Sequence, residues 1–181
     1  MRERKAVRIR PAHTNDAEEI ARVVRASYTP HDAAHIPADL PIYEPAFHLR
    51  AMSDPATRWA LACENGRPVG VAMWRLVPGV AHLHMLFVSG EAQGRGYGVR
   101  LLRHHQTESV RERPDVRIWT LHCLRDSHWA VRFYLHQGYT QYHDGDEWRV
   151  PELVAWIDSC KAHDNGWPLR PEKMLFYKHV R

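Results

Sequence analysis

Val88-Ser89-Gly90-Glu91-Ala92-Gln93-Gly94-Arg95-Gly96-Tyr97-Gly98 is the stretch that decides the fold of this chain. An apolar run at residues 83–88 comes just before it, and an amphipathic segment at residues 99–111 follows it. We therefore expect a strand that leads through a glycine-rich turn into a helix. The first N–H groups of a helix have no internal partner and carry partial positive charge. Because glycines let that backbone approach a ligand closely, the stretch predicts a cradle for a phosphate or diphosphate.

Two other phosphate-binding turns fit the spacing less well. A P-loop needs a Gly-Lys-Ser/Thr sequence, and no Lys follows any of these glycines. The dinucleotide fingerprint is G-x-G-x-x-G near the start of its domain, with an acidic residue roughly 20 positions on. Here the spacing of Gly94, Gly96 and Gly98 is G-x-G-x-G, well into the chain, although Asp115 lies near the acidic position. An ordinary strand-to-helix turn remains open on this motif alone.

A second motif occupies residues 130–139, Ala-Val-Arg-Phe-Tyr-Leu-His-Gln-Gly-Tyr, after a strand-like run at residues 117–124. Its pattern A-x-x-x-Y-x-x-x-G-Y and the earlier pattern V-x-x-x-x-Q-G-R-G-Y-G together resemble the paired motifs of the GNAT (GCN5-related) N-acetyltransferase superfamily. Two motifs matched at fixed spacing and in the expected order point to the same family. Two departures stand out: Gly90 replaces a Pro found in many members, and Ser127 replaces an Asn. Ser127 can still cap the helix that follows it.

The order of predicted elements agrees with that resemblance. Strands are expected at residues 7–10, 59–63, 69–76, 81–88, 117–124, 139–143 and 173–180. Helices are expected after the caps at residues 14–16, then at residues 44–52, 99–111, 127–137 and 151–161. This is a layered α/β (α+β) pattern. The resemblance implies a mixed, mostly antiparallel sheet flanked by helices, in one N-acetyltransferase domain spanning residues 1–181.

Composition sets the broad class of protein. The 181 residues are 44% hydrophobic and 25% charged, which is typical of one globular domain. No run is long enough to cross a membrane, and the charged N-terminus lacks the apolar core of a signal peptide. Three widely spaced cysteines, Cys63, Cys123 and Cys160, favour reduced thiols. We therefore expect a cytoplasmic protein without a membrane partner.

The net charge of +4 raises the question of nucleic acid. The basic residues are scattered among acidic ones, so no basic tract of the kind that binds nucleic acid is present beyond the first few residues. Mild basicity suits an anionic small molecule equally well. Nucleic acid is therefore not an expected partner, and a homodimer is possible.

The resemblance assigns the donor site. It implies acetyl-CoA as co-substrate, with the backbone of residues 86–88 aligning the pantetheine arm, an N–H near Val88 facing the oxyanion, and the amides of residues 93–98 holding the diphosphate. Arg95 and Arg100 would add charge nearby. The residues expected to contact the coenzyme are Leu86, Phe87, Val88, Gln93, Gly94, Arg95, Gly96, Tyr97, Gly98, Ser127 and Tyr134.

The resemblance also assigns a general acid. The candidate general base is chosen from its position in the strand that precedes the glycine-rich turn. Tyr134 matches the tyrosine that protonates the departing thiolate, the alternative being an aromatic packed on the sheet. His82 falls where some members carry a catalytic Glu, and His84 shares its face of the strand by the two-residue period. Both histidines could instead line a wet cleft, with water chains carrying the proton. His31 and His35, four residues apart, lack a third ligand, so no metal is expected.

Together these expectations predict an acetyl-CoA-dependent N-acetyltransferase, in which a primary amine of a small molecule attacks the thioester directly. The open alternatives are a protein lysine or N-terminal acceptor, a larger acyl group, and a module that senses acyl-CoA without turnover. Aromatic residues that could line the acceptor site or belong to the core are Tyr28, Tyr43, Trp74, Trp119 and Trp148.

Overall fold

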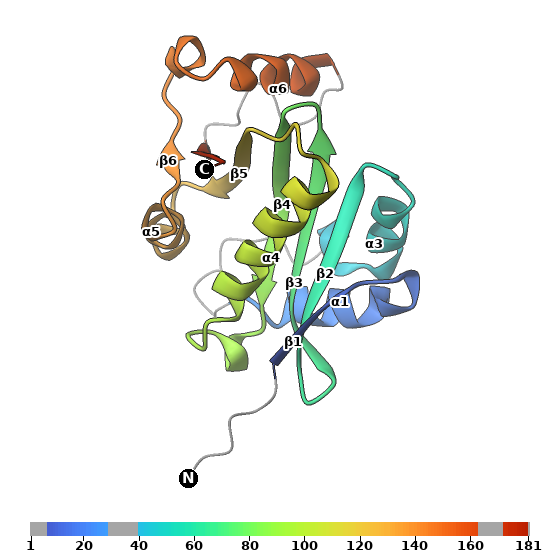
Figure 1. The fold of residues 1–181 in the computed structure, drawn as a ribbon. Coiled ribbons are helices and arrows are strands. Elements are labelled where there is room, and N and C mark those ends of the chain that lie inside the picture. Colours follow the sequence, from blue (N-terminus) through green and yellow to red (C-terminus); the bar gives the residue numbers. More distant parts are fainter. Residues whose placement is uncertain (1–6, 29–39, 163–171, 181) are drawn as a thin grey trace. The chain divides into compact units, whose positions relative to one another are not determined.

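The computed structural model describes residues 7–28, 40–162 and 172–180. Its strands and helices are β1 (Val7–Pro11), α1 (Ala17–Arg25), α3 (Pro45–Met52), β2 (Thr57–Glu64), β3 (Arg67–Val77), β4 (Val80–Val88), α4 (Tyr97–Glu112), β5 (Ile118–Leu124), α5 (His128–His136), β6 (Thr140–Gln141), α6 (Pro151–Ala162) and β7 (Lys173–His179) (Figure 1). Short 3-10 turns are η1 (Thr14–Asp16), η2 (Pro41–Tyr43), η3 (Gly90–Ala92) and η4 (Asp146–Trp148).

The strands form one sheet in the order β1-β2-β3-β4-β5-β7-β6. The β1–β2, β2–β3, β5–β7 and β6–β7 pairs are antiparallel, and β4 pairs with β5 in parallel. This confirms the predicted mixed, mostly antiparallel sheet with flanking helices. The chain clusters into two compact units. Unit 1 comprises residues 1–75 and 85–107, and unit 2 comprises residues 76–84 and 108–181.

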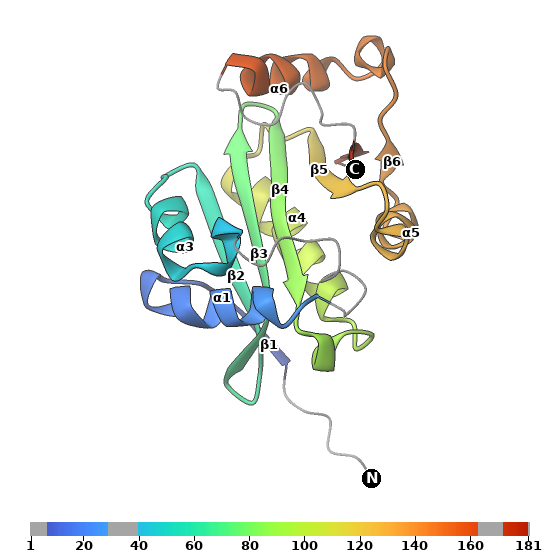
Figure 2. The ribbon, with the colours of Figure 1, turned by 180° about the vertical axis from the view of Figure 1, so that it is seen from behind.

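The core of unit 1 follows from strand alternation. Successive side chains of a strand point to opposite faces, so Trp59 and Leu61 of β2 share the face of Val71 in β3. Helix α1 packs on that face and buries Ile20, whose exposure is 0%. Burying each such large apolar side chain contributes about 1.5–3 kcal/mol. Figure 2 shows α1 and α3 on the same side of the strands.

The other face of unit 1 carries small residues, which let α4 come close. A Cβ on Gly70 would lie 3.0 Å from Leu101 Cδ1 and 3.2 Å from the Phe87 carbonyl oxygen, so only glycine fits there without movement. Leu101 is fully buried. The indole of Trp74 meets the ring of His105 at 5.4 Å, and His105 has no exposed surface. Close packing against these small residues therefore fixes the position of α4, the helix that follows the glycine-rich turn.

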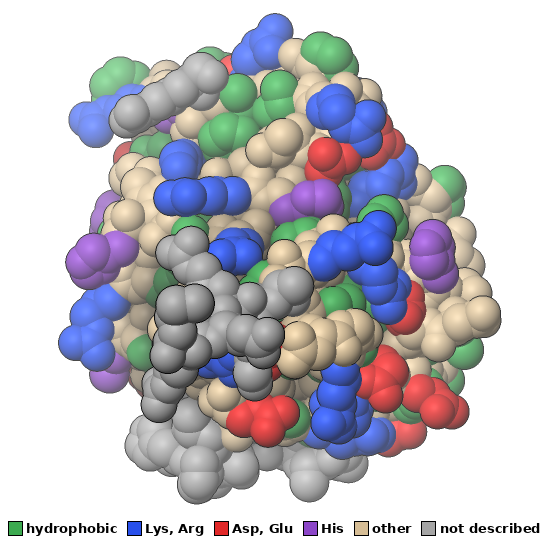
Figure 3. Space-filling view, turned by 60° about the horizontal axis from the view of Figure 1, so that its bottom comes forward, with side chains coloured by type: hydrophobic (Ala, Val, Ile, Leu, Met, Phe, Trp, Pro, Cys, Tyr) green, Lys and Arg blue, Asp and Glu red, His purple; other side chains and the backbone are tan. Residues whose placement is uncertain are grey.

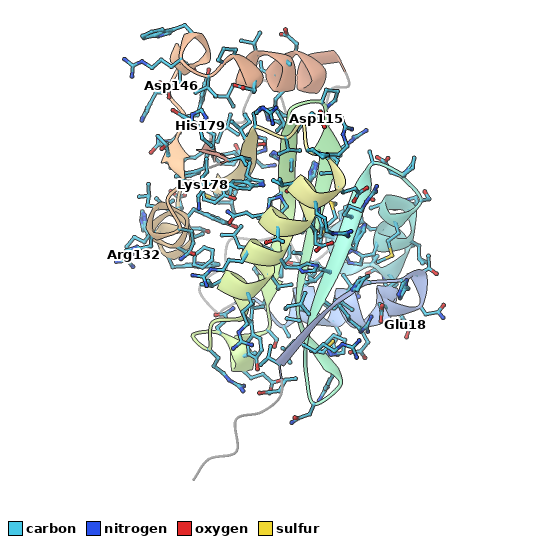
Figure 4. The ribbon with its side chains drawn as sticks, in the orientation of Figure 1. Glu18, Asp115, Arg132, Asp146, Lys178 and His179 are labelled. Carbon is cyan, nitrogen blue, oxygen red and sulfur yellow. The ribbon has the colours of Figure 1, made fainter. Side chains whose placement is uncertain are left out.

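The core of unit 2 is built between α6 and three strands. Val80, Ile118 and Leu175 pack with Leu153 and Trp156 of α6. Helix α5 ends at His136, and Gly138, just past its C-cap, has a φ of +79° that suits glycine. On β7, Lys178 (labelled in Figure 4) donates to the Gln137 carbonyl at 2.7 Å, which secures the last turn of the helix that carries Tyr134.

The sequence predicted which strands and helices occur more accurately than the residues at which they end. Between β2 and β3, Asn65 and Gly66 both have positive φ (51° and 81°), as a type I′ hairpin turn requires and as an Asn-Gly pair favours. Strand β6 is shorter than expected, because the His143 amide donates to Asp146 and starts a turn. Ser127 does occupy the N-cap of α5, but its side chain makes no capping hydrogen bond. None of the described helices is both long and apolar enough to span a membrane.

The burial of His105 predicts acid sensitivity of the fold. Burial, followed by the charge of His104, lowers the pKa of His105 from 6.5 to about 3. The unfolded chain therefore binds a proton that the folded chain excludes, so the stability contributed by neutral His105 is complete above pH 6.5 and is lost as pH falls toward 3. From pH 7 to pH 5 the unfolding free energy should drop by about 2 kcal/mol through this group.

We expect His105→Phe to reduce that pH 7 to pH 5 loss by a similar amount in urea unfolding. His143→Phe, at an exposed position, serves as the control and should leave the loss unchanged. An equal loss in wild type and His105→Phe would mean that other groups cause it.

Candidate functional site

The glycine turn, residues 89–98, joins β4 to α4 in unit 1. Gly94 and Gly96 have φ of +72° and +82°. A Cβ on either would meet no atom within 4 Å, so backbone conformation, not crowding, demands glycine there. In the part of the chain that the structure describes, the amides of residues 94–98 donate to no oxygen. Unpaired N–H groups at the start of a helix, here one of 16 residues, are suited to binding an anion.

Hydrogen bonds hold the first half of the glycine turn to the rest of unit 1. The Ser89 amide donates to the Val69 carbonyl at 2.9 Å, and the Gly90 amide donates to the Ala26 carbonyl at 2.6 Å. The side chain of Gln93 donates to the carbonyls of Ser27 at 2.7 Å and Val88 at 3.0 Å. The Gln93 amide is also used internally, bonding to Ser89 at 3.1 Å. Gln93 therefore ties the turn to the end of α1.

The second half of the glycine turn is held by one carboxylate. Glu64 is the last residue of β2. Its carboxylate accepts hydrogen bonds from both terminal nitrogens of Arg95 and, at 2.9 Å, from the hydroxyl of Tyr97. The guanidinium of Arg95 also lies over the Tyr97 ring, 5.4 Å from its centroid. The hydrogen bond to Glu64 raises the pKa of Arg95, and burial raises that of Tyr97. We call this arrangement the Glu64 clasp.

A cavity of about 360 Å³ adjoins the Glu64 clasp. It is lined by Glu64, Asn65, Arg67, Val69, Glu91, Ala92 and Arg95. Guanidinium and carboxylate groups thus occur together around it, and its formal charge is balanced.

The paired part of the β4–β5 ladder ends before the residues of β4 that are expected to contact the pantetheine arm. The parallel register pairs Val80 with Ile118 and runs to Leu83 with Leu121. Among the residues that the structure describes it goes no further, although β4 continues to Val88 and β5 to Leu124. Leu86, Phe87 and Val88 are each only partly buried. An unpaired strand edge of this kind can accept an extended ligand as an added strand.

Tyr134 lies in the first part of the second motif, on α5 in unit 2. It is 8% exposed, and its ring contacts those of Phe133 (5.1 Å) and Tyr139 (5.9 Å). Burial first, and then the charges of Cys123 and Tyr139, raise the pKa of the Tyr134 hydroxyl well above its usual range. The phenol therefore keeps its proton throughout the physiological pH range.

Three histidines of unit 2, His82, His84 and His122, form what we call the histidine cluster. The ring of His82 lies 4.5 Å from that of His84 and 4.8 Å from that of His122. Its Nδ1 shares a 2.8 Å hydrogen bond with Thr120 Oγ1, and it stacks on Trp156 at 4.3 Å. His82 is 1% exposed, whereas His84 is exposed. The short distance between their rings agrees with the expected shared face.

His122 differs from the other two members of the histidine cluster. Burial, then the charges of Lys173 and His84, lower the pKa of His122 to about 4, so its imidazole is neutral at pH 7. Its Nε2 has no hydrogen-bond partner within the described residues. No pattern in the sequence predicted its place beside His82.

The remaining predicted positions divide between core and surface. Trp74 and Trp119 are core residues, and the Trp119 indole donates to Ser109 at 2.9 Å. Trp148 is 75% exposed. In unit 1, the ring of Tyr28 packs edge-on against Tyr43 at 5.7 Å and meets Phe87 at 5.8 Å. His31 and His35 lie outside the described residues, as does the side chain of Cys160.

Sequence reasoning also missed Glu64, Thr120 and Trp156. The Asn65-Gly66 hairpin signal places Glu64 at a strand end, but nothing local to it points toward Arg95, which lies 31 positions away. Thr120 shares the register of His82 through the β4–β5 pair, which sequence alone does not specify. Trp156 lies in the helix expected at residues 151–161, and no local pattern predicts that it stacks on His82. Each of these roles depends on tertiary contacts.

Comparison with known proteins identifies the family. The sequence model described as the acetyltransferase (GNAT) family matches residues 18–139, which include the glycine turn and the second motif and make up more than half of the chain. The chain therefore belongs to the GNAT family of acetyltransferases. It is an acyltransferase of the N-acetyltransferase type.

Solved structures share the fold. The PaiA N-acetyltransferase of Thermoplasma acidophilum, in complex with coenzyme A, matches with a TM-score of 0.70 at 16% identity, over 97% of this chain and 99% of that one. An acetyltransferase of Thermus thermophilus matches with a TM-score of 0.68 at 22% identity, over 97% of each chain. The ribosomal-protein-S18-alanine N-acetyltransferase of Escherichia coli matches with a TM-score of 0.66 at 14% identity, over 97% and 94%.

One curated relative aligns over a shorter segment. It is a component of the ion-translocating oxidoreductase complex of Photorhabdus laumondii, and it is 33% identical over 85 residues, which cover 41% of this chain and 41% of that protein. The chain thus spans less than half the length of the curated relative that it matches.

Proposed function

We propose that this chain transfers the acetyl group of acetyl-CoA to a primary amine of a small molecule, by direct attack of the amine on the thioester. The observation that carries the proposal is the set of unpaired amides at residues 94–98, held in place at the start of α4. Such a group of donors suits the diphosphate of coenzyme A. The chain's GNAT membership and the coenzyme A bound to the PaiA protein support the same donor.

In the proposed reaction, the backbone of Leu86, Phe87 and Val88 aligns the pantetheine arm, and an N–H near Val88 faces the carbonyl oxygen. The amine nitrogen attacks the thioester carbon, a C–N bond forms, and the C–S bond breaks. Holding the thioester and the amine together supplies much of the rate enhancement. The fixed N–H stabilises the negative charge that develops on the oxygen.

Tyr134 is proposed to assist the leaving thiolate. Its raised pKa keeps the hydroxyl protonated, so that it always has a hydrogen bond to donate. Because a thiol is more acidic than this phenol, with a reference pKa of about 8.5, donation of the hydrogen bond stabilises the thiolate, and solvent completes its protonation.

His82 is proposed as the base that takes up the amine proton. Its burial favours transfer through a neighbouring group over direct contact with the amine, and the exposed ring of His84, 4.5 Å away, is suited to that step. The hydrogen bond to Thr120 and the stack on Trp156 fix the orientation of the His82 ring.

Two further observations bear on the acceptor. The aromatic contacts of Tyr28 with Tyr43 and Phe87 favour an amine with a flat or apolar part. Figure 3 shows Lys and Arg side chains interspersed with acidic ones on the face in view, which favours recognition of isolated anionic groups over a nucleic-acid backbone.

The proposal predicts release of free thiol from acetyl-CoA when a library of small primary amines is added. A thiol-reactive dye measures the release, and mass spectrometry identifies the acetylated amine. Coenzyme binding by calorimetry without thiol release across the library would instead indicate a sensor, and release only with peptides would indicate a protein acceptor.

Removal of the Tyr134 hydroxyl should slow turnover. We expect Tyr134→Phe to lower kcat roughly 100-fold, the lower end of the range of acid–base catalysis, while the affinity for coenzyme A changes little. Tyr139→Phe, at the ring beside it, is the control and should retain most activity. Wild-type kcat in Tyr134→Phe would leave the hydroxyl without a role in the reaction.

The base assignment predicts a change in the pH profile. A base must be neutral to act, so kcat/KM should fall as pH drops through the pKa of the imidazole system. His82→Ala should lower kcat/KM and flatten this acid-side limb, and His84→Ala should affect the same limb. His143→Ala, which removes an exposed histidine outside the cluster, should leave the limb in place. If the acid-side limb of the kcat/KM profile is unchanged in both His82→Ala and His84→Ala, the base does not lie in the histidine cluster.

A further inference from the structure

The Glu64 clasp ties two residues of the glycine turn to a rigid strand. Glu64 ends β2, where its backbone pairs with Val7 of β1 on one side and with Arg67 of β3 on the other. Its side chain is 12% exposed. A carboxylate on a strand paired on both edges is a fixed anchor, so a group bound to it loses most of its freedom.

The geometry of the clasp brackets Gly96. Arg95 binds both carboxylate oxygens through its two terminal nitrogens, and Tyr97 donates its hydroxyl to Oε1. Gly96, between them, sits at φ +82° with open space around it. Nothing in its own surroundings would hold this glycine in one conformation, since glycine visits both signs of φ readily. The two flanking side chains supply that restraint.

The expected role of Arg95 changes in consequence. An arginine without an ion-pair partner could attract the phosphate by its charge. The guanidinium of Arg95 instead forms a bidentate pair with Glu64, which is directional as well as attractive. Its bonds fix the direction of the chain at the point where the unpaired amides begin. An exposed charge near an anion acts weakly through solvent, so the restraint on the turn outweighs the loss of free positive charge.

We propose that Glu64 is a positioning residue for the diphosphate of coenzyme A: acting through Arg95 and Tyr97, it keeps the amides of residues 94–98 aimed at one point. This inference rests on the proposed donor and adds a residue outside both family motifs. When only a fraction of molecules has the turn in the competent conformation, the apparent Kd rises by the inverse of that fraction. Loss of the clasp that leaves about a tenth of the turns competent raises the Kd roughly tenfold.

The test compares a donor that carries the diphosphate with one that lacks it. Glu64→Ala should raise the Kd for coenzyme A and the KM for acetyl-CoA roughly tenfold, and leave the KM for S-acetylpantetheine unchanged. Glu64→Gln keeps an acceptor for Tyr97 but loses the charge, and should fall between wild type and Glu64→Ala. In an Arg95→Met, Tyr97→Phe background, Glu64→Gln should add little to the Kd for coenzyme A, because the two side chains through which it acts on the turn are already gone.

Glu91→Gln is the matched control. Glu91 lines the same cavity and adds its charge near Arg95, but the two form no ion pair in the described ranges. It should therefore leave the Kd unchanged, which separates restraint of the turn from local charge. Thermal unfolding of each variant checks that the fold is retained.

The outcomes are distinct. Failure of the wild-type protein to bind coenzyme A would remove the proposed function itself. Binding by wild type with equal or tighter binding by both Glu64 variants would overturn the positioning role, and so would an equal loss for acetyl-CoA and S-acetylpantetheine, since that indicates general damage to the protein.

Discussion

The unpaired amides at the start of α4 are the constraint on which the rest of unit 1 depends. Residues 94–96 are exposed, so their N–H groups can stay unpaired by protein, while contacts on either side restrict the backbone. Gln93 ties the turn to the end of α1, and Glu64 ties it to the end of β2. Close packing of Leu101 on Gly70 fixes the helix itself. The cradle is thus preorganised by three separate parts of the unit.

In unit 2, burial sets the protonation state of two titratable side chains. Removal of water raises the pKa of the Tyr134 phenol and lowers that of the His122 imidazole, so each is held in its neutral form. Neutral groups suit the proposed reaction, in which a proton leaves an amine and a thiolate needs a hydrogen bond. The exposed His84 beside the buried His82 gives the histidine cluster one member in contact with solvent and one held in fixed orientation.

A titratable side chain is also buried in unit 1, where its burial makes the fold sensitive to acid. His105 is buried against Trp74 with neither ring nitrogen paired among the described residues, and it can only be accommodated as the neutral imidazole. His105 is buried because α4 turns this position onto the small-residue face of the sheet.

By itself the sequence determined the order of the elements, the glycine turn and the second motif, and with them the family. These signals are local: apolar runs, an Asn-Gly hairpin, and glycines where φ is positive each depend on a few adjacent residues. Only the tertiary structure decided that Arg95 binds Glu64, that His82 is buried under Trp156, and that Thr120 lies opposite His82. Such pairings join residues far apart in the chain, and they follow from strand register and helix packing, which no local pattern encodes.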